Sequence, residues 1–155
     1  MLAQPDLLRG LTDEQCAEVL ALGSRLSVAS GKDLFTLGSE AECVFVIERG
    51  RIRLTLPMKV RGSEEDVLVE ERCAGQTIGW SALIPPYRFT LKASAPLDAE
   101  VICLPRKQLQ QHFASHPEVG AIVALNLASV VGQRLQLFQT MWLREMQRTI
   151  ELTCA

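Results

Sequence analysis

The sequence has few of the side chains that usually bind metals or carry out catalysis. It contains two histidines, His112 and His116, and no C-x-x-C pair. Two histidines at i and i+4 can bind one metal ion on a helix face, but no third ligand can be named here. We therefore interpret both histidines as solvated helix residues. No serine or cysteine motif has a base placed beside it. We therefore expect a protein that is not an enzyme and has no metal site.

The cysteines are too scattered for a disulfide framework or a metal cluster. There are five of them, an odd number, at Cys16, Cys43, Cys73, Cys103 and Cys154. Such spacing favours reduced thiols that are mostly buried. Cys154, near the end of the chain, is expected to be exposed and able to cross-link in air.

The charge and hydropathy of the chain argue against a nucleic-acid-binding, secreted or membrane-spanning protein. The net charge is -2 and basic residues are interleaved with acidic ones, so the chain lacks the field that attracts nucleic acid. The first ten residues lack a signal-peptide pattern, and the apolar stretch 119–132 is interrupted and too short to span a bilayer. We expect a cytoplasmic protein with no direct nucleic acid binding and no membrane span. A hydrophobic content of 48% predicts that a second copy covers some apolar surface.

The order of hydrophobic periods predicts one domain. Thr12 and Gln15 form a capping-box pattern at the start of an amphipathic helix that Gly23 ends. At least about six short runs of period two then follow in fewer than about eighty residues, with no helix long enough to cross over between them, which is typical of an antiparallel sandwich or barrel. The expected elements within residues 1–155 are an N-terminal helix at 8–25, a β jelly roll at 26–104, a short helix at 105–117 and a long helix at 118–152.

The long C-terminal helix is predicted to dimerise. Its apolar residues are too many for a single stripe, and a solitary helix of this length has little to cover it in a small domain. One face can pack on the barrel while another meets a second chain, and we expect a homodimer. Four residues at three-four spacing are the candidates for the dimer contact: Val131, Leu135, Phe138 and Trp142.

The glycine spacing and order of elements resemble the cyclic nucleotide-binding domain family, in particular the sensor domain of Crp/Fnr-type bacterial regulators. The resemblance runs from Leu8 to about Arg144. Its clearest part is "SGKDLFTLGSEAECVFVIERGRIRL", followed by "CAGQTIGWSAL", which looks like the start of a phosphate-binding cassette. The resemblance implies an eight-stranded jelly roll, a small-molecule ligand and a long helix that covers the pocket and dimerises.

The cassette departs from the pattern of the family at two positions. Relatives that bind cyclic nucleotides carry a glutamate directly after the second glycine, where Trp80 stands here, and an arginine on the next strand. Trp80 donates one N–H and accepts nothing, so it cannot replace that glutamate. Alternation places Tyr87 with Phe89 on the inward face of a strand and Arg88 on the outward face, so Tyr87 takes the position of the arginine.

We therefore expect an altered pocket in which canonical cyclic nucleotide binding is lost. Phe89 stands where relatives carry alanine, and the rings of Trp80, Tyr87 and Phe89 are predicted to converge on one cavity and fill it. The candidate ligand residues are Gly79, Trp80, Ser81, Ala82, Leu83, Tyr87, Arg88, Phe89 and Thr90. One alternative is an aromatic-lined site for a different flat ligand, with Ser81 and Arg88 as polar handles. Another is an intact cyclic nucleotide site that uses Arg88.

Two roles follow from this sequence, and neither includes a helix-turn-helix, for which the 155 residues leave no room after the long helix. The first is a sensor module in which a small ligand alters the packing of the long helix and hence the dimer presented to a partner protein. The second is a ligand-free dimeric scaffold. A third alternative is that the chain is a fragment of a longer protein.

Overall fold

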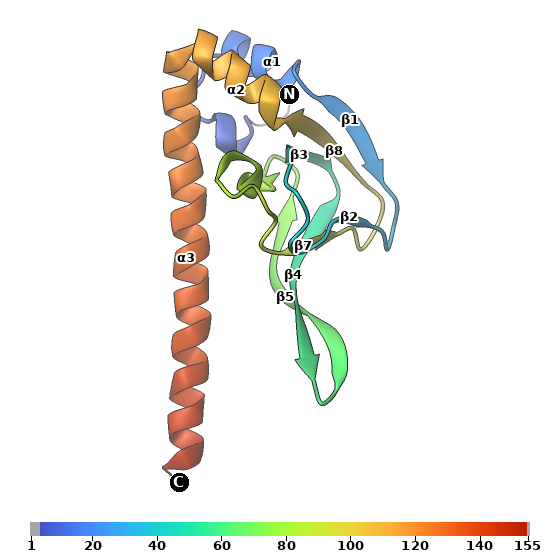
Figure 1. Cartoon of the computed structure of the whole chain (residues 1–155), viewed down its shortest axis with the longest axis vertical. Coiled ribbons are helices and arrows are strands. Elements are labelled where there is room, and N and C mark those ends of the chain that lie inside the picture. The colour runs from blue at the N-terminus through green and yellow to red at the C-terminus, as the bar shows by residue number, and fades with distance from the viewer. Residues whose placement is uncertain (1–3, 155) are drawn as a thin grey trace.

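The chain folds as two antiparallel sheets that face each other, with helices on one side (Figure 1). This structure is a computed structural model that describes residues 4–154. The first sheet has the order β1 (Ser24–Val28), β8 (Ala99–Pro105), β3 (Cys43–Arg49), β6 (Thr77–Ile78). The second has the order β2 (Asp33–Phe35), β7 (Lys92–Ser94), β4 (Arg51–Val60), β5 (Ser63–Cys73). The predicted mainly β jelly roll with flanking helices is confirmed.

The N-terminal helix is shorter than the sequence predicts. A 3-10 turn, η1 (Asp6–Leu8), precedes α1 (Asp13–Leu20), which begins with the expected capping box. In place of a helix to residue 25, β1 already begins at Ser24. The reason lies at Gly23, where an added Cβ would meet the carbonyl oxygen of Cys103 at 2.6 Å, so the chain passes too close to β8 for a helical side chain.

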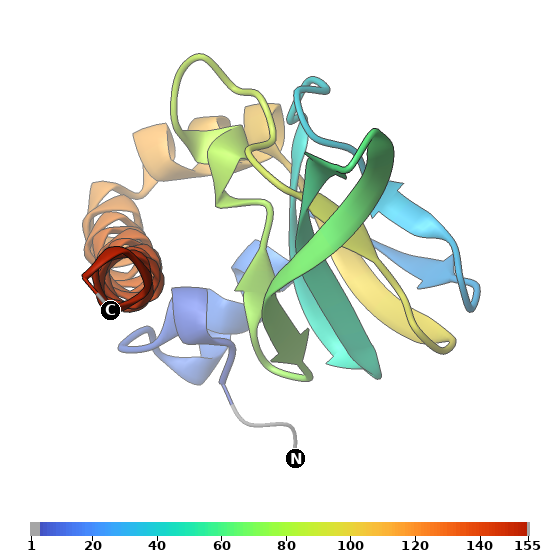
Figure 2. The same ribbon diagram turned by 90° about the horizontal axis from the view of Figure 1, so that it is seen from below.

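The long helix stands beside the roll and continues well past it. A short helix, α2 (Arg106–Ser115), follows the last strand, and α3 (Pro117–Thr153) confirms the predicted long helix. Figure 2 looks along α3 and shows it flanking the roll next to the N-terminal elements. The upper part of α3 is fixed there because the Asn126 amide donates hydrogen bonds to the carbonyls of Leu7 and Arg9, both 2.8 Å long.

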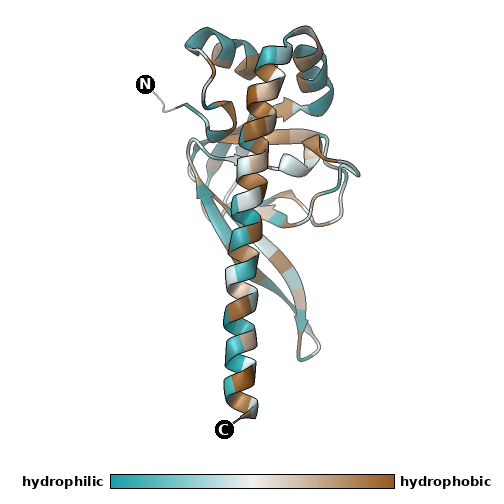
Figure 3. Ribbon diagram, turned by 90° about the vertical axis from the view of Figure 1, so that its left-hand side faces the viewer, coloured by the Kyte–Doolittle hydropathy of each residue, from teal (hydrophilic) through white to brown (hydrophobic). Residues whose placement is uncertain are grey.

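The apolar character of α3 is stronger than the interrupted stretch 119–132 indicates. Within this helix a stretch long enough to span a bilayer is apolar, has few charged residues and is mostly not buried. By length and composition alone, α3 could therefore cross a membrane, which corrects the prediction that its apolar run is too short. Figure 3 looks onto the side of α3 turned away from the sheets, where hydrophobic residues recur down to the C-terminal end.

Candidate functional site

The cassette begins at a glycine that no other residue can easily replace. Gly79 has a φ of +77° and leads into the short helix η2 (Trp80–Leu83). A Cβ at this position would lie 3.2 Å from the carbonyl oxygen of Cys43 and 3.3 Å from the ring of Phe89. Both the left-handed backbone and the close approach thus require glycine. Ala82 is completely buried and its N–H donates to the Gly79 carbonyl over 3.0 Å, while Leu83 packs against the core.

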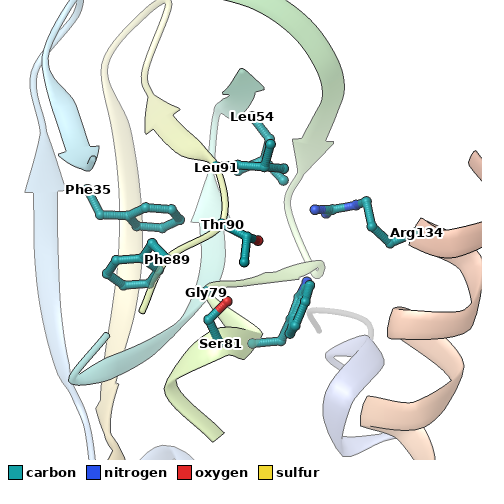
Figure 4. Close-up of a pocket in the computed structure, with 9 residues that line it drawn as sticks. Phe35, Leu54, Gly79, Ser81, Phe89, Thr90, Leu91 and Arg134 are labelled. Carbon is teal, nitrogen blue, oxygen red and sulfur yellow. The ribbon is translucent and has the colours of Figure 1, made fainter. Parts of the chain in front are cut away.

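Two phenylalanine rings occupy the space in front of the cassette. The rings of Phe35 and Phe89 stack with centroids 3.7 Å apart and planes within 9° (Figure 4). The ring centroid of Phe45 lies 5.9 Å from that of Phe35. The cavity that remains measures about 10 Å³, which is roughly the space of one water molecule. Its lining consists of Phe35, Leu54, Gly79, Trp80, Ser81, Phe89, Thr90, Leu91 and Arg134.

Tyr87 does not join this aromatic cluster, which corrects the prediction that three rings converge on the cavity. Tyr87 has a φ of +59°, so the chain turns sharply instead of continuing as an extended strand. Its ring lies against the guanidinium of Arg106, 4.0 Å from ring centroid to Cζ. Arg106 also donates hydrogen bonds to the carbonyls of Ala41 and Ala82. Phe35 takes the place in the cluster that the sequence assigned to Tyr87.

The segment after Tyr87 keeps the predicted alternation, although its strand is shorter. β7 covers only Lys92–Ser94, and Arg88 forms an isolated bridge with Glu40. Phe89, Leu91 and Ala93 are buried, whereas Arg88 and Thr90 are exposed. The Arg88 guanidinium donates to the carbonyl of Gly38 at 3.0 Å and is absent from the lining of the cavity.

Arg134 reaches the cavity from α3 as part of a chain of charges. Its guanidinium contacts the Glu70 carboxylate at 2.9 Å, Glu70 contacts Arg72 at 3.0 Å, and Arg72 contacts Asp6 at 2.8 Å. The Arg134 and Arg72 side chains are only 10% and 7% exposed. Burial lowers the pKa of Arg134, but an arginine in such a site remains charged. The chain of charges links α3, β5 and the N-terminal turn.

The predicted dimer residues lie along one stripe of α3 but differ in burial. Leu135 and Trp142 are 59% and 61% exposed, Val131 is half-buried, and Phe138 packs partly against the core. Phe138 therefore supports the monomer as well as any contact with a second chain. We call Val131, Leu135, Phe138 and Trp142 the seam.

The remaining polar candidates form no metal site within residues 4–154, where no group of three or more His, Cys, Asp or Glu side chains is placed to hold an ion. The rings of His112 and His116 stack 4.3 Å apart, and His116 Nδ1 lies 3.2 Å from the His112 carbonyl. Burial, together with a hydrogen bond to Cys103, raises the pKa of the Cys43 thiol to about 12. Cys154 is exposed, as expected.

A larger hollow lies away from the cassette. It is a groove of about 670 Å³ between α1 and β3, with apolar walls from Leu20, Val46 and Ile102 and carboxylates of Asp13 and Glu48. Its size falls within the range of small-molecule sites, about 300–1,000 Å³, so a ligand test has to distinguish it from the cassette.

The two facing sheets, the left-handed glycine before η2 and the long helix against the pocket define a ligand-sensing β-roll. Comparison with known proteins agrees with this class, because residues 25–116 match the model of the cyclic nucleotide-binding domain. That match covers more than half of the chain. The chain belongs to the cyclic nucleotide-binding domain family.

Solved structures share the fold over most of the chain. The N-terminal domain of a transcriptional regulator from Streptomyces coelicolor is 25% identical, with a TM-score of 0.69 over 83% of this chain and 89% of that one. The catabolite activator protein of Thermus thermophilus is 23% identical, with a TM-score of 0.70 over 96% of this chain and 63% of that one.

A curated relative is a much longer protein. Glutaminase 1 of Bradyrhizobium diazoefficiens is 28% identical over 134 residues, which is 86% of this chain. The match spans 21% of that protein, so the chain corresponds to about a fifth of its length.

The predicted ligand residues did not include several residues of the site, among them Phe35, Arg106 and Arg134. Arg134 carried a usable signal, because it is the only charged residue between Glu118 and Arg144 on an otherwise apolar helix. A lone charge on such a helix usually has a partner. Phe35 and Arg106 carried no comparable signal, since both depend on how the loop at residues 84–88 turns.

Proposed function

We propose that the chain is a non-enzymatic regulatory module of the cyclic nucleotide-binding type whose pocket is occupied by its own aromatic side chains. The observation that carries the proposal is the stack of Phe35 on Phe89, 3.7 Å between centroids. With about 10 Å³ left beside the cassette, a nucleotide cannot enter unless these rings move, since ligand sites usually measure about 300 Å³ or more.

The polar groups of the cassette support the same proposal. Trp80 offers no acceptor for a ribose hydroxyl. Tyr87 stands in the position of the arginine that holds the phosphate in relatives, and its ring is packed on Arg106. Arg88, the other candidate, is bound to the Gly38 carbonyl. We therefore propose that cyclic AMP and cyclic GMP bind weakly or not at all.

The output of the module is a homodimer formed through α3. Leu135 and Trp142 of the seam are more than half exposed, and burying such side chains contributes about 1.5–3 kcal/mol each. A second copy brings the same residues, so two seams can cover each other in a symmetric pair. Asn126 and Arg134 hold a different side of α3 on the roll, which favours a cytoplasmic dimer over a helix inserted in lipid.

The module is proposed to lack catalytic and nucleic-acid-binding roles of its own. A net charge of -2 gives no attraction to phosphate backbones. The chain corresponds to only about a fifth of the length of the relative named Glutaminase 1. We therefore assign no glutamine hydrolysis to this domain. A regulatory module attached to or serving other proteins accounts for both observations.

A second candidate is a site for a different flat ligand that inserts among the aromatic rings. Ser81 and Arg134 are the polar side chains of the cavity that would bind this ligand. Arg134 takes the role that the sequence predicted for Arg88. This candidate requires Phe89 to change its rotamer so that the small cavity opens. A ligand-free scaffold requires no such movement.

Thermal melting of the purified protein with cyclic AMP, cyclic GMP, linear nucleotides and small aromatic acids tests these proposals. A ligand at a hundred times its dissociation constant adds about 2.7 kcal/mol and raises the melting temperature by several degrees. We expect no shift with either cyclic nucleotide. A shift with a cyclic nucleotide in the wild type that is reduced in Ser81→Ala, whose side chain lines the cavity, would place the nucleotide in the cassette and overturn the proposal.

The oligomeric state is tested separately by sedimentation of Leu135→Glu/Trp142→Glu. Both side chains are exposed in the monomer, so the variant should fold and sediment as a monomer. Flotation of the wild type with anionic vesicles is the counter-test. Vesicle binding by a protein that stays monomeric in solution contradicts the dimer.

A further inference from the structure

The groove of about 670 Å³ between α1 and β3 lies on the outer face of the first sheet. Val46 of β3 and Ile102 of β8 are opposite each other in the sheet, and both line the groove. Phe45, the neighbour of Val46, stacks with Phe35 in the aromatic cluster. Because side chains alternate along a strand, Val46 and Ile102 point away from that cluster. The groove and the cassette cavity share no lining residue, so they are separate places for a ligand.

The groove is bounded on three sides. The outer face of the sheet forms one side, and α1 forms a second with Leu20. The third side comes from residues 4–5 and Gly75, and it is held in place because the Asp6 N–H donates to the Gly75 carbonyl over 3.0 Å. A small molecule fits such a hollow, whereas a partner helix needs a groove that is open along its length.

Two carboxylates give the groove a negative charge. They belong to Asp13 and Glu48, and among residues 4–154 no lysine, arginine or histidine lines the groove. α1 adds to this charge, because it carries three acidic residues and no basic one. The Glu48 side chain is only 14% exposed, while the guanidinium that contacts it at 3.2 Å, from Arg25, is 82% exposed. An ion pair with so exposed a partner is weak, which leaves Glu48 able to bind a second cation.

These walls and charges together select one class of ligand. The apolar walls favour a hydrocarbon or aromatic body, because the contact removes apolar surface from water. The carboxylates favour an ammonium or guanidinium group, which can donate charge-assisted hydrogen bonds to them. Anions such as nucleotides or fatty acids are repelled by the same carboxylates.

The groove also adjoins the turn to which α3 is anchored. Pro5 lines the groove, and the next residue, Asp6, begins η1 and binds Arg72 in the chain of charges that ends at Arg134. The Asn126 amide of α3 donates hydrogen bonds to carbonyls of the same turn. A ligand in contact with Pro5 therefore acts on a segment that α3 holds at two places.

We infer that the groove between α1 and β3 is a ligand site for a small amphiphilic cation. The cationic group binds at the carboxylates of Asp13 and Glu48, and the apolar part of the ligand covers Val46 and Ile102. Occupancy of the groove reaches α3 through the N-terminal turn. The inference goes beyond the proposed function and does not depend on it, because the cassette lies on the other face of the sheet.

Calorimetric titration with octylammonium, octanol and octanoate tests the class of ligand. The three probes share one apolar chain and differ in the charge of the head group, and each is used below the concentration at which it forms micelles. We expect octylammonium to bind at least about 10-fold more tightly than octanol, and octanoate not to bind. Any other order, or no binding of octylammonium, overturns the inference. Binding of a basic amphipathic peptide in place of octylammonium would reassign the groove to a partner protein.

Matched variants test whether the binding takes place in the groove. Glu48→Gln should raise the dissociation constant of octylammonium about 10-fold and leave that of octanol unchanged, because only the charge is removed. Glu100→Gln, on β8 and outside the groove, is the control and should change neither. Ala17→Trp fills the groove from an exposed position on α1 and should abolish binding of both probes. Thermal melting checks that the variants fold, and unchanged affinity in Glu48→Gln or Ala17→Trp overturns the inference.

NMR spectra recorded during the titration test the location of the ligand and its link to α3. With octylammonium, we expect the amide signals of α1 and of residues 46–48 to shift, together with the side-chain amide signals of Asn126. Shifts confined to the cassette at residues 79–91 overturn the site. Shifts in the groove without a shift at Asn126 overturn the link to α3. The proposed function is tested separately, by cyclic nucleotides and by sedimentation, so its failure and the failure of this inference are distinguishable.

Discussion

Arg134 of the long helix and Glu70 of β5 form an ion pair, 2.9 Å long, that joins α3 to the β4–β5 hairpin. Glu70 also contacts Arg72, so one carboxylate lies between two guanidinium groups that are 10% and 7% exposed. The side of α3 that faces the roll, and hence the side left for a second chain, is set by this contact and by Asn126.

Replacement of Glu70 should therefore lower the free energy of unfolding much more than replacement of an ordinary surface charge. Glu70→Gln leaves Arg72 and Arg134 close together with no carboxylate between them, and we expect a loss of about 3–5 kcal/mol in the free energy of unfolding. Glu71→Gln, whose partner Arg51 is 70% exposed, should lose at most about 1 kcal/mol. Urea unfolding measures both, and equal effects would contradict the buried network.

Phe89→Ala should destabilise the protein by about 3–5 kcal/mol, because it removes one ring of a stacked pair and leaves a cavity in the core. Phe89→Leu, which keeps more of the volume, should cost less. Thermal melting and urea unfolding report the change. If Phe89→Ala melts like the wild type, the ring does not fill the pocket, and the flat-ligand alternative gains support.

Gly79→Ala should destabilise more than Gly62→Ala. Both glycines have positive φ values, +77° and +82°, but only at Gly79 does an added Cβ meet other atoms, the nearest at 3.2 Å. The backbone strain is common to both variants and costs about 1–2 kcal/mol. The difference between the two free energies of unfolding isolates the steric part, and no difference would mean that the backbone at Gly79 relaxes freely.

The Cys43 thiol should react slowly with iodoacetamide at pH 8. Its pKa of about 12 in the folded protein keeps it protonated, whereas the thiolate is the reactive form. Mass spectrometry should find exposed Cys73 and Cys154 alkylated first. Early modification of Cys43 in native protein would contradict the raised pKa.

The same pKa predicts a loss of stability in alkali. The ordinary pKa of a cysteine is 9.0, so between about pH 9 and 12 the unfolded chain releases a proton that the folded chain keeps. The unfolded state then binds fewer protons, and the free energy of unfolding falls as pH rises. Below pH 9 this residue contributes no pH dependence. Cys43→Ala should unfold with a smaller pH dependence across that window than the wild type.

The sequence by itself determined the order of the elements and the inward face of the segment that follows Tyr87. Thr12 and Gln15 placed the first helix start because a capping box is a local contact. The inward set Phe89, Leu91 and Ala93 followed from period two alone, although the regular strand covers only Lys92–Ser94. Both patterns depend only on residues that are neighbours in sequence. They therefore hold even where the strand is shorter than predicted.

Only the tertiary structure decided what fills and surrounds the pocket. Tyr87 turns to Arg106 because the loop bends at a positive φ, and Phe35 takes its place against Phe89 from a strand far away in sequence. Arg134 enters the cavity because Glu70 draws it there. Each of these contacts joins elements whose relative placement depends on the packing of the whole core, so no local pattern could have specified them.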